Sequence, residues 1–440
     1  MTAQKTYTIF LGGLPKMKRI VFVLLIALMA MSVSVINAQE ESDGDCAEPT
    51  GVTLRLAGWS SSEAEDAALQ AQLEAFNCAT GHEAVFTPST DHRVTMQTAF
   101  ASGDYPEVFY IDSSYLPDWV EAGVVAEGED NIEDIDGFYQ SLLDIFTYDG
   151  VLYCPPKDFS TMTLQYNKDL FDAAGLEYPN SDWTWEDLYA AAEALTDEEA
   201  GVIGLVTPPN LERWLPFLYQ ADGALFDDFG VFVLDSEEAL NAIDFYISFA
   251  QNGVGGPPSV VDAGWGGEAF GTGRAAMAME GNWVIKFLLD NYPDLNWGVA
   301  ELPAGPEGER ATMAFTVCYG VAADNAYPDE SWELVNFLTG TEGAQNFAQV
   351  SFGPMPPRPA AEEAYLENFI TLSEGLGVDA TEFQAFFDSA EYAYPWVLPV
   401  GWGPFTDAFN AALQQAFAGE LTAQEVLDAA LAAADELLSE

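Results

Sequence analysis

Histidines and basic residues are scarce in this chain of 440 residues, which has two histidines and 13 lysines and arginines against 71 aspartates and glutamates. The histidines are His82 and His92, and neither lies near a G-x-S-x-G nucleophile elbow. No His/Cys spacing typical of a zinc site is present either. The sequence therefore predicts neither a catalytic triad nor a metal centre. We expect no cofactor and interpret both histidines as structural or surface residues.

The formal net charge of −58 disfavours several classes of partner. Repulsion would keep nucleic acid and anionic membranes away, and it disfavours anionic substrates such as phosphate esters. The charge does not predict disorder, because 49% hydrophobic and 13% aromatic residues are enough to form packed cores. We relate the acidity to a saline or acidic exterior, which would screen or protonate the carboxylates.

The apolar run Ile20 to Met31 is shorter than the ~20 residues that a membrane span needs. Lys16, Lys18 and Arg19 lie directly before it, and small residues follow it up to Ala38. This pattern predicts a secretory signal over residues 1–38 that is cleaved before Gln39, with a membrane anchor as the alternative.

Cysteine is scarce too, with four in the chain. An exported protein folds in an oxidising space, where four cysteines allow three pairings. We favour Cys46–Cys78, which would tie the N-terminus of the mature chain to the end of its first helix. Reduced, buried thiols are the alternative.

The length of the chain allows two or three domains. Strands are predicted at 52–57, 82–87 and 108–112, and helices are predicted between them at 63–77 and 93–101. This alternation predicts an α/β protein with a parallel sheet covered by helices on both faces. Ligands of such sheets sit beyond the carboxyl ends of the strands, and here those positions are Trp59, Ser60, Asp112 and Ser113.

The centre of the chain carries a family resemblance. An aromatic-Asp-Gly turn at Tyr148–Gly150 leads into Cys154-Pro155-Pro156-Lys157-Asp158, and Tyr166-Asn167-Lys168-Asp169 follows. This order resembles the family 1 extracellular solute-binding proteins, the sugar receptors of bacterial ABC importers. Further similar segments are 102–112, 183–195, 214–224, 270–279 and 353–359, so that the resemblance covers about residues 50–430.

The resemblance implies a two-lobe periplasmic-binding-protein-like fold of type II, similar to maltose-binding protein. Each lobe would be a central sheet flanked by helices, and the chain would cross between the lobes three times. Segments 47–155 and 319–352 would form lobe 1, and segments 157–316 and 356–440 would form lobe 2.

The same resemblance places an extended run, Thr312 to Ala323, beside the first crossing strand. It thereby implies a second disulfide, Cys154–Cys318, that staples the two hinge strands to each other.

A sugar receptor needs aromatic platforms for the C–H faces of the sugar and carboxylates or amides for its hydroxyls. Six tryptophans fall at strand ends, junctions or Gly/Pro-flanked loops and are the predicted platforms: Trp59, Trp214, Trp265, Trp283, Trp396 and Trp402. The predicted polar groups are Asp112, Asp158, Glu280 and Asn282. In contrast, Trp119, Trp183, Trp185 and Trp332 are interpreted as packing residues.

The expected protein is a monomeric, exported, non-catalytic receptor in the periplasm or at the cell surface. It would bind a neutral mono- or oligosaccharide between its lobes and deliver it, by hinge closure, to the transmembrane subunits of an ABC permease. Two alternatives stay open. One is a secreted carbohydrate-active hydrolase that uses two of the many carboxylates. The other is a receptor of the same fold for a polyamine or another cation.

Overall fold

The computed structural model describes residues 46–60, 63–89, 91–227, 230–350, 353–376 and 383–439. The predicted signal segment therefore lies outside the described residues. The chain divides into two units, Met1–Ala47 and Glu48–Glu440. Of the first unit only Cys46 and Ala47 are described, without regular secondary structure. The second unit contains all the helices and strands of the described residues.

The first strands and helices alternate as the sequence predicts. Strands β1 (Thr53–Gly58), β2 (Glu83–Pro88) and β3 (Val108–Asp112) are linked by helices α2 (Glu63–Thr80) and α3 (His92–Ser102). β1 pairs in parallel with both β2 and β3. The carboxyl ends of β1 and β3 therefore lie at one edge of the sheet.

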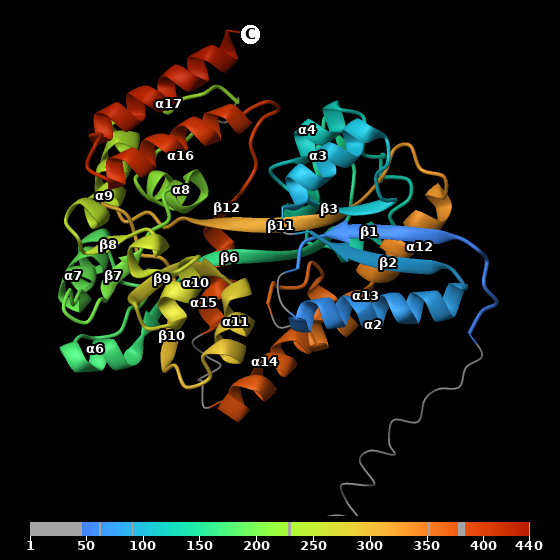
Figure 1. The fold of residues 1–440 in the computed structure, drawn as a ribbon, viewed down its shortest axis with the longest axis horizontal. Coiled ribbons are helices and arrows are strands. Elements are labelled where there is room, and N and C mark those ends of the chain that lie inside the picture. The colour runs from blue at the N-terminus through green and yellow to red at the C-terminus, as the bar shows by residue number, and fades with distance from the viewer. Residues whose placement is uncertain are drawn as a thin grey trace, which may run out of the picture. The chain divides into compact units, whose positions relative to one another are not determined.

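Two long strands carry the sheet onward (Figure 1). β11 (Thr312–Val321) is antiparallel to both β3 and β6 (Pro156–Asn167), and β6 is antiparallel to β9 (Ala275–Gly281) and β10 (Trp297–Ala300). The order is β2-β1-β3-β11-β6-β9-β7-β8, and β12 pairs with β11. The remaining strands are β4 (Thr147–Tyr148), β5 (Val151–Leu152), β7 (Ile203–Val206), β8 (Gly255–Gly256) and β12 (Ala393–Pro395). The predicted parallel pairing thus holds for β1 to β3, and the complete sheet is mixed.

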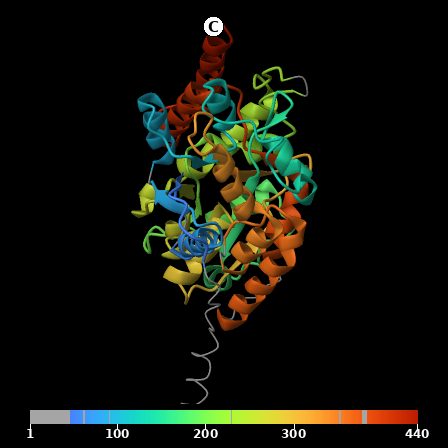
Figure 2. The same cartoon turned by 90° about the vertical axis from the view of Figure 1, so that its right-hand side faces the viewer.

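Helices cover both faces of this sheet (Figures 1 and 2). Two helices begin at capping boxes, Thr184 with Asp187 and Thr422 with Glu425. The further helices are α4 (Leu116–Glu121), α5 (Gln140–Ile145), α6 (Lys168–Ala174), α7 (Trp185–Leu195), α8 (Leu211–Gln220), α9 (Glu237–Gln251), α10 (Gly266–Gly271), α11 (Trp283–Asn291), α12 (Pro328–Thr339), α13 (Thr341–Val350), α14 (Glu362–Leu376), α15 (Gln384–Asp388), α16 (Gly403–Phe417) and α17 (Ala423–Leu438).

The buried apolar side chains form three clusters. One surrounds β1 and β3 and includes part of β11 and α12. A second lies between α7, α8, α9, α16 and α17. The third joins β9, α11 and β10 to α14 and α15. β6 and β11 run between the first cluster and the other two (Figure 1).

Cys154 and Cys318 form a disulfide with a Cα–Cα distance of 5.7 Å, which confirms the pairing expected from the family resemblance. Cys154 precedes β6, and Cys318 lies within β11. Cys46 and Cys78 are also disulfide-bonded, and none of the described cysteines is free.

Candidate functional site

A cavity of about 280 Å³ opens beside the first half of β6 and the middle of β11. Five of its lining residues are aromatic: Trp59, Trp265, Trp283, Phe287 and Phe315. The others are Lys157, Asp158, Ser160, Val317 and Pro354. We call this cavity the aromatic pocket.

Strand pairing explains why the pocket's floor has this composition. Phe315 of β11 lies opposite Ser160 of β6, and Val317 lies opposite Asp158. Because side chains alternate between the faces of a strand, these four residues point to the same side of the sheet. Strand β11 thus supplies apolar surface to the pocket floor, and strand β6 supplies polar groups.

The three tryptophans themselves lie outside the strands and are held by contacts with neighbouring side chains. The Trp59 ring, just after β1, packs edge-on against Tyr110 with a centroid distance of 5.3 Å. Trp265 directly precedes α10, and its ring is 4.7 Å from that of Phe287. Each indole is therefore partly packed against the protein and partly open to the cavity.

Trp283 is the most constrained of the three. Its Nε1 donates to Oε2 of buried Glu280 at 2.9 Å, and Arg213 Nη2 donates to the same oxygen at 2.9 Å. The Arg213 guanidinium lies 5.5 Å from the Trp283 ring and 5.6 Å from that of Phe315. Glu280 therefore fixes the indole, and Arg213 compensates the buried charge of Glu280.

A buried ion cluster forms another wall. Lys157 Nζ donates to Glu65 Oε1 at 2.8 Å and also to Asp158 Oδ2. The ammonium lies about 5 Å from the rings of Tyr110 and Phe347. Burial alone would lower the pKa of Lys157, but Asp158 and Glu65 raise it well above its usual value, so the side chain stays charged. The pocket wall thus carries the Lys157 cation and the Asp158 carboxylate, and Glu65 pairs with Lys157 from outside the lining.

The Ser160 hydroxyl is buried and has no hydrogen-bond partner within the protein. Buried polar groups are normally paired, and an unpaired one costs stability. In a pocket wall such a hydroxyl is available to a ligand.

Asp112 lies beside the pocket, since it pairs with Val317 across β3 and β11. Its Oδ1 accepts hydrogen bonds from the Ser114 backbone N–H at 2.9 Å and from the Ser114 hydroxyl at 2.5 Å. Burial nevertheless raises the pKa of Asp112 to about 6. This carboxyl changes its protonation within the range of mildly acidic surroundings.

The structure brings together four of the predicted ligand residues, Trp59, Asp158, Trp265 and Trp283, in the lining of the aromatic pocket. Glu280 accepts a hydrogen bond from Trp283, which lines the pocket. Asn282 Oδ1 accepts a hydrogen bond from the Thr161 backbone N–H of β6 at 3.2 Å.

The other predicted residues at the edge of the sheet make contacts within the protein. Ser60 is exposed and donates to Asp66 at 2.6 Å. Ser113 donates from its hydroxyl to the Trp396 carbonyl at 2.6 Å. Trp396 is half-buried and does not line the aromatic pocket.

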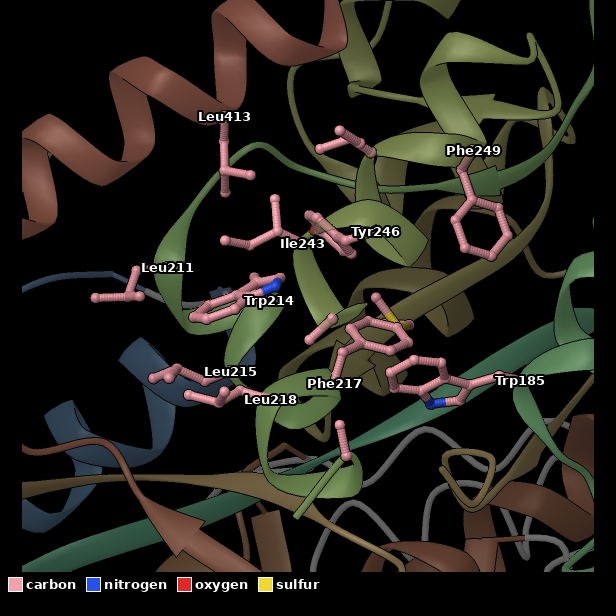
Figure 3. Close-up of a cluster of buried hydrophobic side chains, with 14 of the residues drawn as sticks. Trp185, Leu211, Trp214, Leu215, Phe217, Leu218, Ile243, Tyr246, Phe249 and Leu413 are labelled. Atoms are coloured by element: carbon pink, nitrogen blue, oxygen red, sulfur yellow. The ribbon is translucent and has the colours of Figure 1, made fainter. Parts of the chain in front are cut away.

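The interpretation of Trp214 and Trp402 as ligand platforms at junctions or loops is wrong. Trp214 lies inside α8 with no exposed surface, in a cluster with Leu211, Leu215 and Tyr246 (Figure 3). Its ring packs 4.7 Å from that of Phe409. Trp402 is also buried, against Phe226 and Phe232. Both tryptophans pack in the second cluster, where α8 and α16 bury their apolar faces.

Sequence reasoning missed Arg213, Ser160, Phe287 and Phe315. Ser160 could have been found, since it lies two residues after Asp158 in a predicted strand and must share its face. Arg213 gave no signal, because its role depends on a carboxylate far along the chain.

His92 is buried, and its Nε2 lies 2.9 Å from the Tyr110 carbonyl. Burial lowers its pKa. His82 Nδ1 lies 2.7 Å from the Thr50 hydroxyl. Both histidines are thus engaged in local structure. Over the part of the chain that the structure describes, no group of three or more His, Cys, Asp or Glu side chains could hold a metal ion. Within the same part, no helix combines the length and apolar character needed to cross a bilayer.

Comparison with known proteins gives concordant matches. A sequence model of the family described as bacterial extracellular solute-binding protein matches residues 71–371. A binding protein of Brucella abortus is 27% identical over 353 residues, which is 78% of this chain and 82% of the relative. The arabinooligosaccharide-binding protein of Halalkalibacterium halodurans is 25% identical over 214 residues, 46% of this chain and 47% of that one.

Among solved structures, an ABC substrate-binding protein from Listeria monocytogenes in complex with cycloalternan superimposes with a TM-score of 0.77 at 23% identity. The match covers 88% of this chain and 99% of that one. At this identity the likeness shows the fold, which is the expected two-lobe type II architecture.

Proposed function

Because the chain belongs to the bacterial extracellular solute-binding proteins, we propose that it is an exported receptor for a neutral mono- or oligosaccharide. In this proposal the sugar binds in the aromatic pocket, and the loaded receptor delivers it to the transmembrane subunits of an ABC permease. The observation that carries the proposal is that Trp59, Trp265 and Trp283 line one cavity together with the carboxylate of Asp158 and the unpaired hydroxyl of Ser160.

Sugar chemistry fits this set of groups. Indole rings cover the C–H faces of a pyranose, while carboxylates and hydroxyls take up its hydroxyl groups. Within the proposal the three indoles stack on the sugar, and Asp158, Ser160 and Asp112 bind hydroxyls. Glu280 and Asn282 position the groups around Trp283 and β6. The names of matched proteins, which refer to arabinooligosaccharide and cycloalternan, support the saccharide class.

Hinge closure is the proposed mechanism. Trp59 packs against the cluster around β1 and β3, whereas Trp265 and Trp283 pack against the cluster around β9 and α11. Lobe 1 is expected to comprise residues 47–155 and 319–352, and lobe 2 to comprise residues 157–316 and 356–440. This division assigns the two clusters to opposite sides of β6 and β11. A ligand that contacts indoles from both sides stabilises the closed arrangement, since the open one offers it fewer contacts.

A thermal-shift screen of purified mature protein tests the proposal. The panel contains neutral mono- and oligosaccharides, spermidine and glycerol phosphate. We expect at least one neutral saccharide to raise the unfolding temperature in a saturable way, because a ligand that binds only the folded state stabilises it. The saccharide should be recovered intact. Release of reducing sugar that one Asp or Glu substitution abolishes would support a hydrolase instead, and stabilisation by spermidine alone would support a cation receptor.

A further inference from the structure

A second cavity lies on the opposite face of β6 and β11 from the aromatic pocket. Asp158 and Ser160 of β6 line the aromatic pocket, whereas Phe159 and Thr161 line the second cavity. In β11, Ala314 faces the second cavity, next to Phe315 of the aromatic pocket. The two strands thus form a shared wall, with alternate side chains on each side. We call the second cavity the rear cavity.

The rear cavity is the larger of the two, with a volume of about 680 Å³. That size lies within the ~300–1,000 Å³ typical of small-molecule sites. Much of its lining is apolar and comes from Leu142, Ile145, Phe387, Pro395 and Val397. Val397 is 37% exposed, so apolar surface is open to an incoming molecule.

The charge of the rear cavity is of one sign. Among the residues that the structure describes, its lining includes two carboxylates, Asp144 and Glu362, and no lysine, arginine or histidine. Glu362 accepts a hydrogen bond from the Tyr139 hydroxyl. The Thr161 hydroxyl donates to the Phe386 carbonyl at 2.6 Å, so this part of the floor offers a ligand no free donor.

Aromatic rings lie close to these carboxylates. The Tyr139 ring packs edge-on against Phe159 with a centroid distance of 5.9 Å, and Phe387 lines the same cavity. Ring faces combined with negative charge attract organic ammonium groups. A fully hydrophilic polyamine would leave the apolar lining uncovered, and an organic anion would meet only like charge.

We propose that the rear cavity binds a small organic cation that has an apolar body and one ammonium group. The body covers Phe159, Phe387 and Val397, and the ammonium lies near Asp144 and Glu362. This site does not depend on what occupies the aromatic pocket, so it stands or falls separately from the proposed function.

Calorimetric titration with a matched pair of probes tests this site. The pair is 1-naphthylmethylammonium and its neutral analogue 1-naphthalenemethanol, which share an apolar body. We expect one equivalent of the ammonium to bind at least about fivefold more tightly than the alcohol. No saturable binding of the ammonium, or equal affinity for both probes, overturns the proposal.

Two independent variants locate the probe. Ala390→Trp places a large ring at the exposed edge of the cavity and should weaken ammonium binding about tenfold or more. The double variant Asp144→Asn/Glu362→Gln should reduce the affinity for the ammonium to that for the alcohol. Thermal melting checks that each variant is folded, and either variant alone is sufficient to decide.

Two control variants separate binding in the rear cavity from general attraction to an acidic protein and from binding in the aromatic pocket. Asp294→Asn/Glu307→Gln removes the same net charge from exposed residues outside both cavities and should leave ammonium binding unchanged. Trp283→Ala alters the aromatic pocket and should also leave it unchanged. An equal loss in the first control would assign the binding to the overall acidity, and a loss in the second would place the probe in the aromatic pocket. Both results contradict the proposal.

Discussion

At the scale of single residues, Trp283 is the side chain on which the proposed sugar site depends most. It is oriented by Glu280, touched by Arg213 and open to the aromatic pocket. We expect Trp283→Ala to weaken saccharide binding by about tenfold to a hundredfold, because stacked aromatic anchors carry much of the energy of such sites. Calorimetry measures the change.

Trp183→Ala is the matched control for this prediction. Trp183 is half-buried against Phe171 at a ring distance of 6.2 Å and lies outside the aromatic pocket. Its loss should leave the saccharide affinity unchanged. Equal affinities for wild type and Trp283→Ala would rule out stacking on this indole.

The raised pKa of Asp112 leads to a prediction about how the stability of the protein depends on pH. Its pKa rises from 3.8 to about 6 on folding because burial disfavours the charged form. The folded protein therefore binds this proton more tightly than the unfolded chain. Stability from this group is complete below about pH 4 and is lost as the pH rises through about 6.

Replacing the Asp112 carboxyl with a group that does not titrate should abolish this loss of stability at neutral pH. We expect Asp112→Asn to be more stable than wild type at pH 7, with a difference that shrinks towards pH 4. Chemical denaturation at several pH values measures it, and Asp294→Asn controls for the change in net charge. A difference that is constant from pH 4 to pH 7 would show that burial does not hold the proton on Asp112.

What the sequence predicts about single residues depends on whether the signal is local. Trp59 was found because it directly follows a recognisable strand, and Asp158 was found because it lies in one. Trp214 was misread because its burial depends on α16, which lies nearly two hundred residues further along the chain. The contacts of Arg213 with Glu280 likewise join distant segments, and no local pattern indicates them.

At the scale of elements, the Cys154–Cys318 bridge links the start of β6 to β11 across 164 residues of chain. We expect Cys154→Ala/Cys318→Ala to lower the free energy of unfolding by about 3–5 kcal/mol, because the bridge restricts a long loop of the unfolded chain. Denaturant titration measures this loss. Saccharide affinity should change little, since neither cysteine lines the aromatic pocket.

The free energy of unfolding of this variant is compared with that of Cys46→Ala/Cys78→Ala, which lacks the other two disulfide-bonded cysteines. Unchanged stability of the Cys154→Ala/Cys318→Ala protein would mean that the paired hinge strands hold together without the bridge.

Helix α7 offers a second test at this scale. Thr184 accepts from the Asp187 backbone N–H, and Asp187 reciprocates at the Thr184 N–H. Thr184→Ala should cost about 1 kcal/mol of unfolding free energy, whereas Thr184→Ser keeps the hydroxyl and should cost much less. Equal losses in the two variants would argue against capping as the cause.

The sequence was most informative about the positions of helices and strands. Strand β3 has the predicted residues, because the pattern that marks a strand is a local signal. β12 was not predicted, since its three residues form a strand only by pairing with β11. The placement of β11 beside β6 was expected only through the family resemblance, and its antiparallel pairing with β3 was not predicted.

At the scale of the whole molecule, the net charge of −58 sets the conditions under which the protein is most stable. Repulsion among carboxylates opposes the compact state, and salt screens it. We therefore expect the unfolding temperature to rise as NaCl increases from low ionic strength to about 1 M, where the screening length is about 3 Å. An equal rise in KCl would identify screening as the cause. A temperature that is flat or falls with salt would contradict this account.

The central claim is that a neutral saccharide fills the aromatic pocket and contacts both expected lobes. A crystal structure of the protein with the saccharide found in the thermal-shift screen tests it most directly. We predict a sugar ring against Trp265 or Trp283 on one side and Trp59 on the other, with a sugar hydroxyl bonded to Ser160. A saccharide bound outside this pocket, or held by residues of one lobe alone, would contradict the claim.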